Sequence, residues 1–205
     1  VITDHHELGE SLPKSCAVIN PHRNEPNSPF ANLCGCGVAF MLILALRKAM
    51  RGAGLFNSAE PNLKKYLDLV ALGTVADVVP LTGINRTLVK YGLKEMSRAP
   101  RPGVAALLDV SATPRNDVSP GSIGFRLAPR LNAAGRIGDA MKALEILTTE
   151  DEVRAASLAV ELDAANRARQ SMEKDILDEI ESATNADPAI ISGDVAVLHS
   201  DRWHV

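Results

Sequence analysis

Aromatic residues are scarce in this sequence and make up only 3% of its 205 residues. Stacking of nucleic-acid bases on aromatic side chains therefore cannot be widespread. An excess of positive charge is also missing, since the formal net charge is −3 at pH 7. The chain as a whole offers a polyanion no general electrostatic attraction, so any such contact must come from a local basic patch.

Long apolar runs and paired cysteines are missing too. The one strongly apolar stretch, Val38–Leu46, is far too short to span a bilayer, and no signal peptide is visible. Cys16, Cys34 and Cys36 form no even disulfide framework, and the spacing of the last two is too tight for an ordinary zinc site. Free thiols fit a reducing compartment, so we predict a cytoplasmic protein with no membrane partner.

The composition is that of a globular protein, with 46% hydrophobic and 23% charged residues. Val1, Ile2 and Thr3 read as the end of a strand, and residues 7–33 are rich in Pro, Asn and Ser, which predicts a long irregular connection. Val195–Leu198 reads as a strand whose partners have not yet appeared. We therefore expect both ends to lie inside a larger protein.

Helical patterns dominate the remaining sequence. The apolar stretch Val38–Leu46 is nearly continuous, which predicts a helix buried on most sides and ending near Gly52. Further helices are expected over residues 63–76, 85–96, 101–110, 119–130, 139–147 and 151–182. The last holds nine acidic and four basic residues and only a thin apolar stripe, which favours a bridge between two domains.

The first candidate site is Asp4-His5-His6, directly after the predicted strand. Chemistry in open α/β sheets is found at such strand ends. Imidazole nitrogens and carboxylate oxygens are natural ligands for Mn²⁺ and similar ions, and adjacent groups can supply both a ligand and the residue that orients it. The alternative is a pair of surface histidines beside a helix-capping Asp.

The second candidate is Asp77, which stands alone in the apolar run from Gly73 to Pro80. Burial of an ionised carboxylate is unfavourable by several kcal/mol unless the group is paired or binds a metal. The alternative is an exposed Asp near a helix end. Together with His5, the metal interpretation is the better one.

The third candidate is an arginine-rich segment around Arg130, Asn132 and Arg136. Residues 98–136 hold six arginines, two acids and no lysine, a local charge of +4. Guanidinium groups bind phosphate in bidentate fashion, and the neighbouring small residues let the backbone approach it. The alternative is that these arginines pair with nearby acids.

The order of these motifs closely resembles the RecJ exonucleases of the DHH family. The resemblance rests on Asp4-His5-His6, on GTVADVVPL at 73–81 and on FRLAPRLNAAGRIGDA at 125–140. Three further segments resemble RecJ, at residues 33–40, 161–170 and 197–204. The set covers essentially the whole chain, and the ordered set is far more specific than any single motif.

The resemblance implies a two-metal phosphodiesterase that uses Mn²⁺ or Mg²⁺. His5 and Asp77 would be metal ligands, Asp4 would orient the neighbouring imidazole, and His6 would face the scissile phosphate. Arg130, Asn132 and Arg136 would contact the substrate phosphates. The activity implied is release of nucleoside 5′-monophosphates from the 5′ end of single-stranded DNA, in recombination and repair, with a helicase or single-strand-binding protein as partner.

The implied fold is α/β: the helix-rich portion of a DHH-type phosphoesterase domain at 1–149, a long connecting helix at 150–185 and the start of the DHH-associated second domain at 186–205. RecJ enzymes carry further acidic motifs before the DHH motif, which here begins at residue 4. We therefore expect the chain alone to show little activity.

Two alternatives stay open at this point. One is another DHH phosphoesterase that acts on oligoribonucleotides, a cyclic dinucleotide or pyrophosphate. The other is a non-catalytic DHH scaffold, which would be expected to have lost its metal ligands, whereas His5, His6 and Asp77 are all present.

Overall fold

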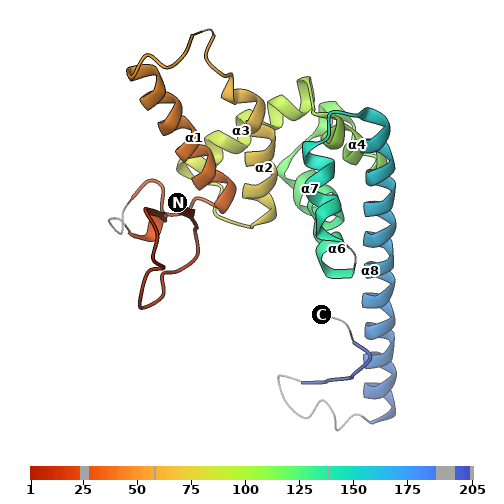
Figure 1. Cartoon of the computed structure of the whole chain (residues 1–205). Helices are drawn as coiled ribbons and strands as arrows, with labels where there is room; N and C mark the ends of the chain where they lie inside the picture. Colours follow the sequence, from red (N-terminus) through yellow and green to blue (C-terminus); the bar gives the residue numbers. More distant parts are fainter. Residues whose placement is uncertain (24–27, 58, 138, 188–196, 204–205) are drawn as a thin grey trace.

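The computed structural model describes residues 1–23, 28–57, 59–137, 139–187 and 197–203. Its helices form two neighbouring groups (Figure 1). The N-terminal unit holds β1 (Ile2–Thr3), β2 (Val18–Ile19), α1 (Gly35–Gly52), α2 (Leu67–Ala76) and α3 (Gly83–Arg98). The helical unit holds α4 (Pro102–Val110), α5 (Pro120–Ser122), a π-helical segment (Ile123–Leu127), α6 (Ala128–Ile137), α7 (Ala140–Thr148) and α8 (Glu152–Ala186).

A small parallel sheet leads into the first motif. Ile2 pairs with Val18 and Thr3 with Ile19, and the Asp4 amide donates to the Ile19 carbonyl at 3.0 Å. The strand before the DHH motif is thereby confirmed. Residues 7–33 are not wholly irregular, however, because the short apolar pair Val18–Ile19 forms β2, and a 3₁₀ turn follows at Pro21–Arg23.

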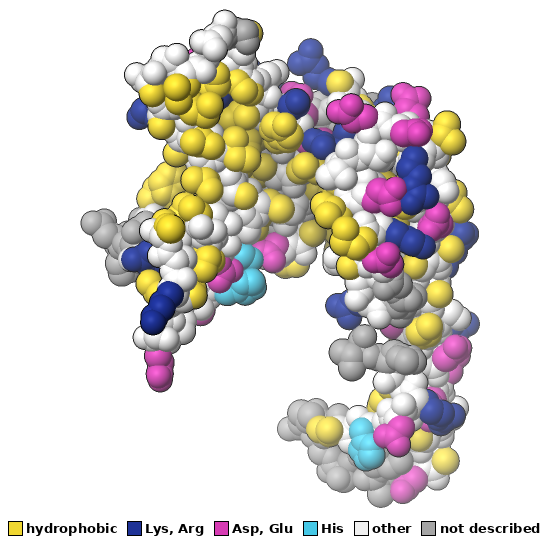
Figure 2. Space-filling model, in the orientation of Figure 1, with side chains coloured by type: hydrophobic (Ala, Val, Ile, Leu, Met, Phe, Trp, Pro, Cys, Tyr) yellow, Lys and Arg dark blue, Asp and Glu magenta, His cyan; other side chains and the backbone are white. Residues whose placement is uncertain are grey.

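Helix α1 is longer than predicted and less buried. Its first turn is capped by Cys34, and the buried positions Val38 and Phe40 lie near that end. The expectation of burial on most sides is wrong, since Ile43 is 40% and Leu46 56% exposed. The reason is that α1 packs mainly on α2, and Figure 2 shows its other side as an apolar surface among the described residues.

Helices α2 and α3 form the most extensive helix pair of the N-terminal unit. A 3₁₀ turn at Leu63–Tyr66 precedes α2. The two helices approach closely at Gly92, because a Cβ at this position would lie 2.1 Å from the Leu67 carbonyl oxygen. Ala71 and Met96, both fully buried, belong to the core on either side of this crossing.

The helical unit packs around fully buried Leu107, Ile123, Ile146 and Leu158. Ser119 caps the segment that begins at α5, as its Ser-Pro pair predicts, and it shares a reciprocal capping box with Ser122. A 3₁₀ turn at Arg115–Asp117 precedes this cap. Helix continues from α5 through the π-helical segment into α6.

Helix α8 is only partly the bridge that its composition predicts. Its first half is a core element, with Leu158 and Leu162 at most 1% exposed and packed in the same core as residues of α4 and α6. From Arg167 to Asp187 no described residue is buried. This part of α8 is therefore solvent-exposed, as its thin apolar stripe predicts. Of the strand predicted at Val195–Leu198, residues 195–196 lie outside the described residues, and residues 197–198 are not in a strand.

Among the described residues, no helix is both long enough and apolar enough to cross a bilayer.

Candidate metal centre and phosphate-binding segment

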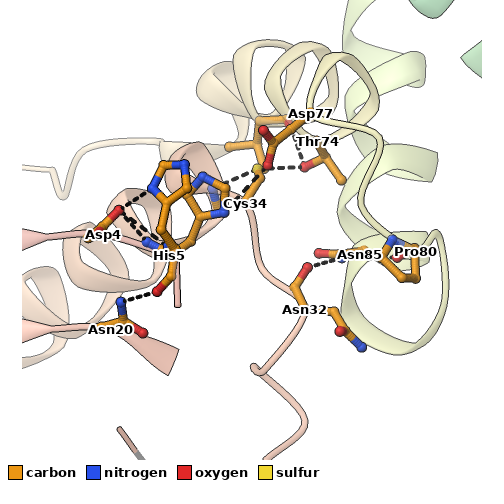
Figure 3. A network of polar contacts seen from close by, with 12 residues as sticks. Asp4, His5, Asn20, Asn32, Cys34, Thr74, Asp77, Pro80 and Asn85 are labelled. Carbon is orange, nitrogen blue, oxygen red and sulfur yellow. Dashed lines mark hydrogen bonds and ion pairs between the residues drawn. The ribbon is translucent and has the colours of Figure 1, made fainter. Parts of the chain in front are cut away.

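The structure brings together the two predicted metal ligands, which are 72 positions apart in sequence. His5 follows β1, and Asp77 is the C-cap residue of α2. The His5 Nδ1 and Asp77 Oδ2 atoms lie 3.5 Å apart (Figure 3). The two side chains are 19% and 37% exposed, so the pair stands at the surface edge of the unit and can be reached by a ligand.

Asp77 is not the buried carboxylate that its apolar neighbours suggest. It lies at a helix end, as the alternative interpretation held, with its amide donating to the Gly73 carbonyl at 3.0 Å. The apolar residues before it belong to α2 and turn into the core, where Val70 and Leu72 are buried. The helix end exposes Asp77 while directing it toward His5.

The residue after Asp77 has a strained backbone. Val78 has a φ of +58°, in the left-handed region that β-branched residues avoid. Its amide donates to the Val75 carbonyl at 3.1 Å, which ends the helix in a position usually taken by glycine. The chain turns sharply immediately after the candidate ligand, and the Val78 side chain is left 87% exposed.

Asp4 organises the DHH motif through one carboxylate oxygen. Its Oδ1 accepts from the His5 amide at 2.8 Å and lies 2.8 Å from His6 Nδ1. The pKa of Asp4 is held below its ordinary value, first by the His6 side chain and then by the backbone amides. The imidazole in contact with Asp4 is thus that of His6, whose side chain is 76% exposed, and the His5 ring is left for Asp77.

Asn20 supports the DHH motif and was not singled out from the sequence. Its Nδ2 donates to the His6 carbonyl at 2.9 Å, and its Oδ1 accepts from the His22 amide at 2.8 Å. Asn20 directly follows β2 as Asp4 follows β1. The signal that could have revealed it is therefore the same strand-end rule, had the two-residue strand β2 been recognised.

The N-terminus of α1 is fastened to α2 beside this pair. Cys34 Sγ accepts from the Gly37 amide and lies 3.3 Å from Thr74 Oγ1. A Cβ at Gly35 would stand 3.4 Å from His5 Cδ2, and one at Gly73 only 2.4 Å from Cys36 Sγ. Small residues thus let the two helices and His5 approach one another.

The two neighbouring thiols influence each other's ionisation. A hydrogen bond from Cys36, supported by those of Thr74 and Gly37, lowers the pKa of Cys34 to about 6. The pKa of Cys36 is raised in turn, chiefly by the Cys34 side chain. Neither thiol was assigned a role from the sequence.

Asn85 ties together the two loops that flank the site. From α3, its Nδ2 donates to the Asn32 carbonyl at 2.6 Å and to the Pro80 carbonyl at 3.0 Å (Figure 3). One loop precedes Cys34 and the other follows Asp77. Asn85 is 1% exposed, and its Oδ1 has no hydrogen-bond partner among the described residues.

The arginine-rich segment divides into paired and unpaired side chains. Arg130 is 16% exposed and binds Asp163 through Nε at 2.9 Å and Nη2 at 2.8 Å. Its Nη1 donates to the Arg126 carbonyl at 2.6 Å. Arg130 therefore follows the alternative interpretation given above, in which the arginines pair with nearby acids. Arg136 is exposed and has no such partner in the described part of the chain.

Asn132 shares a cavity with residues on both sides of Asp77. The cavity has a volume of about 460 Å³, and its lining includes Ala76, Val78 and Asn132. One of the predicted phosphate-binding residues therefore lies near the two predicted metal ligands.

His5 and Asp77 fit one divalent ion, but the described residues do not supply a complete site. Two donors on one octahedral ion of Mg²⁺ size are about 3 Å apart, close to the observed separation of 3.5 Å, and an imidazole with a carboxylate suits Mn²⁺. No group of three or more His, Cys, Asp or Glu residues gathers around a common point within the described ranges.

Comparison with known proteins finds the DHH family, N-terminal domain, over residues 1–74. The chain is 48% identical over 177 residues to the single-stranded-DNA-specific exonuclease RecJ of Dickeya dadantii (strain 3937), a match over 84% of this chain and 31% of that protein. It is 42% identical over 213 residues to the enzyme of the same name from Escherichia coli (strain K12), over 100% of this chain and 36% of that protein. The chain thus spans about a third of the length of these relatives.

Solved structures agree with this result. The crystal structure of RecJ in complex with Mn²⁺ from Thermus thermophilus matches with a TM-score of 0.75 and 37% identity, over 86% of this chain and 25% of that one. A crystal structure of exonuclease RecJ bound to manganese matches with a TM-score of 0.74 and 36% identity, over 86% and 42% of the two chains. The expected helix-rich, DHH-type fold is confirmed. In sequence and in fold, the chain is a relative of the RecJ exonucleases of the DHH family.

Proposed function

We propose that this chain is part of a metal-dependent exonuclease that degrades single-stranded DNA from its 5′ end and releases nucleoside 5′-monophosphates. The observation that carries the proposal is the meeting of His5 and Asp77, 3.5 Å apart, in a chain 42% identical to an exonuclease of that substrate class. Mn²⁺ and Mg²⁺ are the ions we assign, because RecJ structures hold them.

The proposed roles follow from the contacts of each side chain. Asp77 and His5 hold a divalent ion, which when bound polarises the phosphate and activates water in a two-metal arrangement. Asp4 fixes the His6 ring at 2.8 Å, so that His6, largely exposed, can meet the charge that develops on the phosphate. The remaining ligands of a two-metal site must come from outside the described residues.

The phosphate-binding roles are proposed unequally. Arg136 is exposed and has no acidic partner within the described residues, so its guanidinium is available for bidentate contact. Asn132 lines the cavity beside Asp77 and offers an amide donor. Arg130 is held by Asp163, so we assign it the weaker role of stiffening the segment that carries the other two.

The wider assignments extend this proposal. We divide the chain into a DHH domain at 1–149, a connecting helix at 150–185 and the start of a second domain at 186–205, supported by the exposed second half of α8. We also place the enzyme in the cytoplasm, in DNA recombination and repair, with a helicase or single-strand-binding protein as partner. Its three cysteines are free, as expected in a reducing compartment.

Hydrolysis of end-labelled DNA tests the function. In an enzyme of full length that contains this chain, Mn²⁺ should support release of mononucleotides from 5′-labelled single strands, and Asp77→Ala or His5→Ala should abolish it. Asp109→Ala, which removes an exposed acid on α4, is the matched control and should be active. Preference for an oligoribonucleotide, a cyclic dinucleotide or pyrophosphate would overturn the proposal. The chain alone should release little or no mononucleotide.

A further inference from the structure

The cavity of about 460 Å³ beside Asp77 is lined without a single charged side chain. One wall is formed by the end of α2 and the turn after it, with Val75, Val78 and Val79. The opposite wall is the helical stretch that begins at α5, with Phe125 and Asn132. A ligand that fills it must therefore be largely apolar where it is enclosed and able to hydrogen bond at one edge, where the Asn132 amide lies.

Phe125 is the most unusual member of the lining. It is 87% exposed, whereas Phe40 is buried, in a chain with only four phenylalanines. It stands in the π-helical segment Ile123–Leu127, and such segments occur frequently at functional sites. A largely exposed aromatic ring at the wall of a cavity is suited to stack on another flat ring.

The wall that carries Val75, Val78 and Val79 is held in place by the strained turn after α2. Val78, also 87% exposed, keeps a left-handed φ of +58° that glycine would adopt without strain. Strain of this kind persists where the surrounding structure fixes it, and it clusters at ligand sites. Here it places a valine side chain on the cavity side of the turn and the Asp77 carboxylate on the His5 side.

Charge near the cavity matches a phosphate-bearing ligand. Arg136 is one turn after Asn132 on α6, at a spacing that places both on one helix face. Arg136 has no acidic partner among the described residues, and residues 98–136 carry +4 overall. An apolar side chain from another protein segment would use the valines and Phe125 but would leave the amide and the guanidinium without a purpose.

We propose that this cavity binds an unpaired nucleobase, which stacks on Phe125 against the valine wall and contacts Asn132 at its edge, while Arg136 binds a phosphate of the same strand. The inference rests on the proposed function, since a base held here belongs to a strand whose backbone passes the His5–Asp77 pair. It adds a base-binding residue to that function. Unpaired bases can enter such a site, whereas bases stacked within a duplex cannot.

Two oligonucleotides separate base binding from phosphate binding. One is a short oligothymidine with a fluorescent label, and the other has the same length and label but abasic sugars, so that only the phosphates remain. Affinities for this chain are measured by fluorescence anisotropy with a chelator present, which prevents hydrolysis. Phe125→Ala should weaken binding of oligothymidine on the order of ten-fold and leave the abasic strand unchanged.

Three further variants sharpen the measurement. Phe125→Trp should retain the affinity, because it keeps an aromatic face, and Phe125→Leu should lose it, although an apolar surface remains. Tyr91→Ala is the matched control, since it removes an aromatic residue that is 49% exposed on α3. It should change neither affinity.

The outcomes distinguish this inference from the function on which it rests. Equal loss of affinity for both strands in Phe125→Ala, or full affinity in Phe125→Leu, would overturn the base site and leave the nuclease proposal standing. Failure of the unaltered chain to bind either strand would count against the proposed function itself, and the base site with it. A duplex bound as tightly as the single strand would also exclude an unpaired base as the ligand.

Discussion

The charged pairs that join helices and the pair at the candidate metal centre use their atoms in opposite ways. In the helical unit, Arg130 gives its nitrogen atoms to Asp163 and to a backbone carbonyl. Arg101 reaches across to α2 and binds both oxygens of Asp68, at 2.7 and 2.9 Å. At the candidate metal centre, by contrast, His5 and Asp77 only approach each other, at 3.5 Å, and Asp77 is 37% exposed.

This difference teaches which charges are available for function. A buried pair with every donor satisfied has no capacity left for a ligand, and its removal damages the fold. A pair whose atoms are near each other but beyond tight hydrogen-bond distance, and which is open to solvent, adds little to the stability of the fold. Such a pair can accept an ion between its atoms. On these grounds Asp68 and Asp163 belong to the fold, and Asp77 is the carboxylate that we propose for the site.

The largest effect is expected from Asp68→Ala. Its carboxylate side chain is 4% exposed, and its loss leaves the Arg101 guanidinium, which is only 20% exposed, without a counter-charge. Breaking one partner of such a pair costs about 3–5 kcal/mol of unfolding free energy. Urea denaturation followed by circular dichroism measures it.

A double variant supplies the control for this effect. Asp68→Leu combined with Arg101→Met removes both charges at similar volume and should recover most of the lost stability. If Asp68→Ala unfolds at the same urea concentration as the unaltered chain, the buried pair does not hold α2 against α4 as the comparison requires.

These charged residues show which parts of the candidate site could be predicted from the sequence and which could not. Asp4, His5 and Asp77 could be named because their motifs have a recognisable order, and the arrangement of helices could be predicted because apolar periodicity and caps such as Ser119 and Asp151 are local signals. The pairing of Arg130 with Asp163 could not, because it joins positions 33 apart whose contact depends on how α6 packs on α8.

The remaining differences have the same physical origin. The exposure of Leu46 and the exposed position of Asp77 depend on which neighbours cover a helix, and an apolar run does not specify that. Strand β2 was missed because two residues give no alternation to detect. Asn85 was missed because a buried amide that joins two loops has no sequence pattern at all.

A smaller effect is expected from Asn85→Ala. The variant removes two hydrogen bonds from the buried Asn85 amide to backbone carbonyls of the loops that flank the His5–Asp77 pair, which costs about 1–3 kcal/mol. Thr87→Ala, at an exposed position of the same helix, should change stability by less than about 0.5 kcal/mol. Equal melting temperatures for both variants would show that Asn85 does not fasten the loops.

Relief of backbone strain should have the opposite sign. Val78→Gly removes a left-handed β-branched residue whose side chain is 87% exposed, so little packing is lost. The gain from strain, about 1–2 kcal/mol, exceeds the entropy that glycine loses on folding, about 0.5–1 kcal/mol. Ala112→Gly, at φ +49° in the helical unit, makes the same test on the other side of the comparison. A fall in melting temperature for Val78→Gly would contradict the strain.

The smallest effect on stability, and the sharpest test of the comparison, is expected from Asp77→Ala. A partly exposed pair contributes about 0–1 kcal/mol, so urea denaturation should hardly distinguish the variant from the unaltered chain. Its metal binding should change strongly, and this can be measured on this chain even if the affinity is low, because Mn²⁺ broadens the NMR signals of any imidazole that it approaches.

In the unaltered chain, Mn²⁺ should broaden the His5 imidazole signals at concentrations that leave the exposed His199 unaffected. Asp77→Ala should remove this selectivity, because a single imidazole holds the ion too weakly to differ from a surface histidine. Asp163→Ala, by contrast, should retain selective broadening at His5 while losing stability, since its carboxylate belongs to the Arg130 pair. Selective broadening that survives in Asp77→Ala would mean that His5 binds the ion without Asp77, and the division between folding and functional charges would then be drawn at the wrong residue.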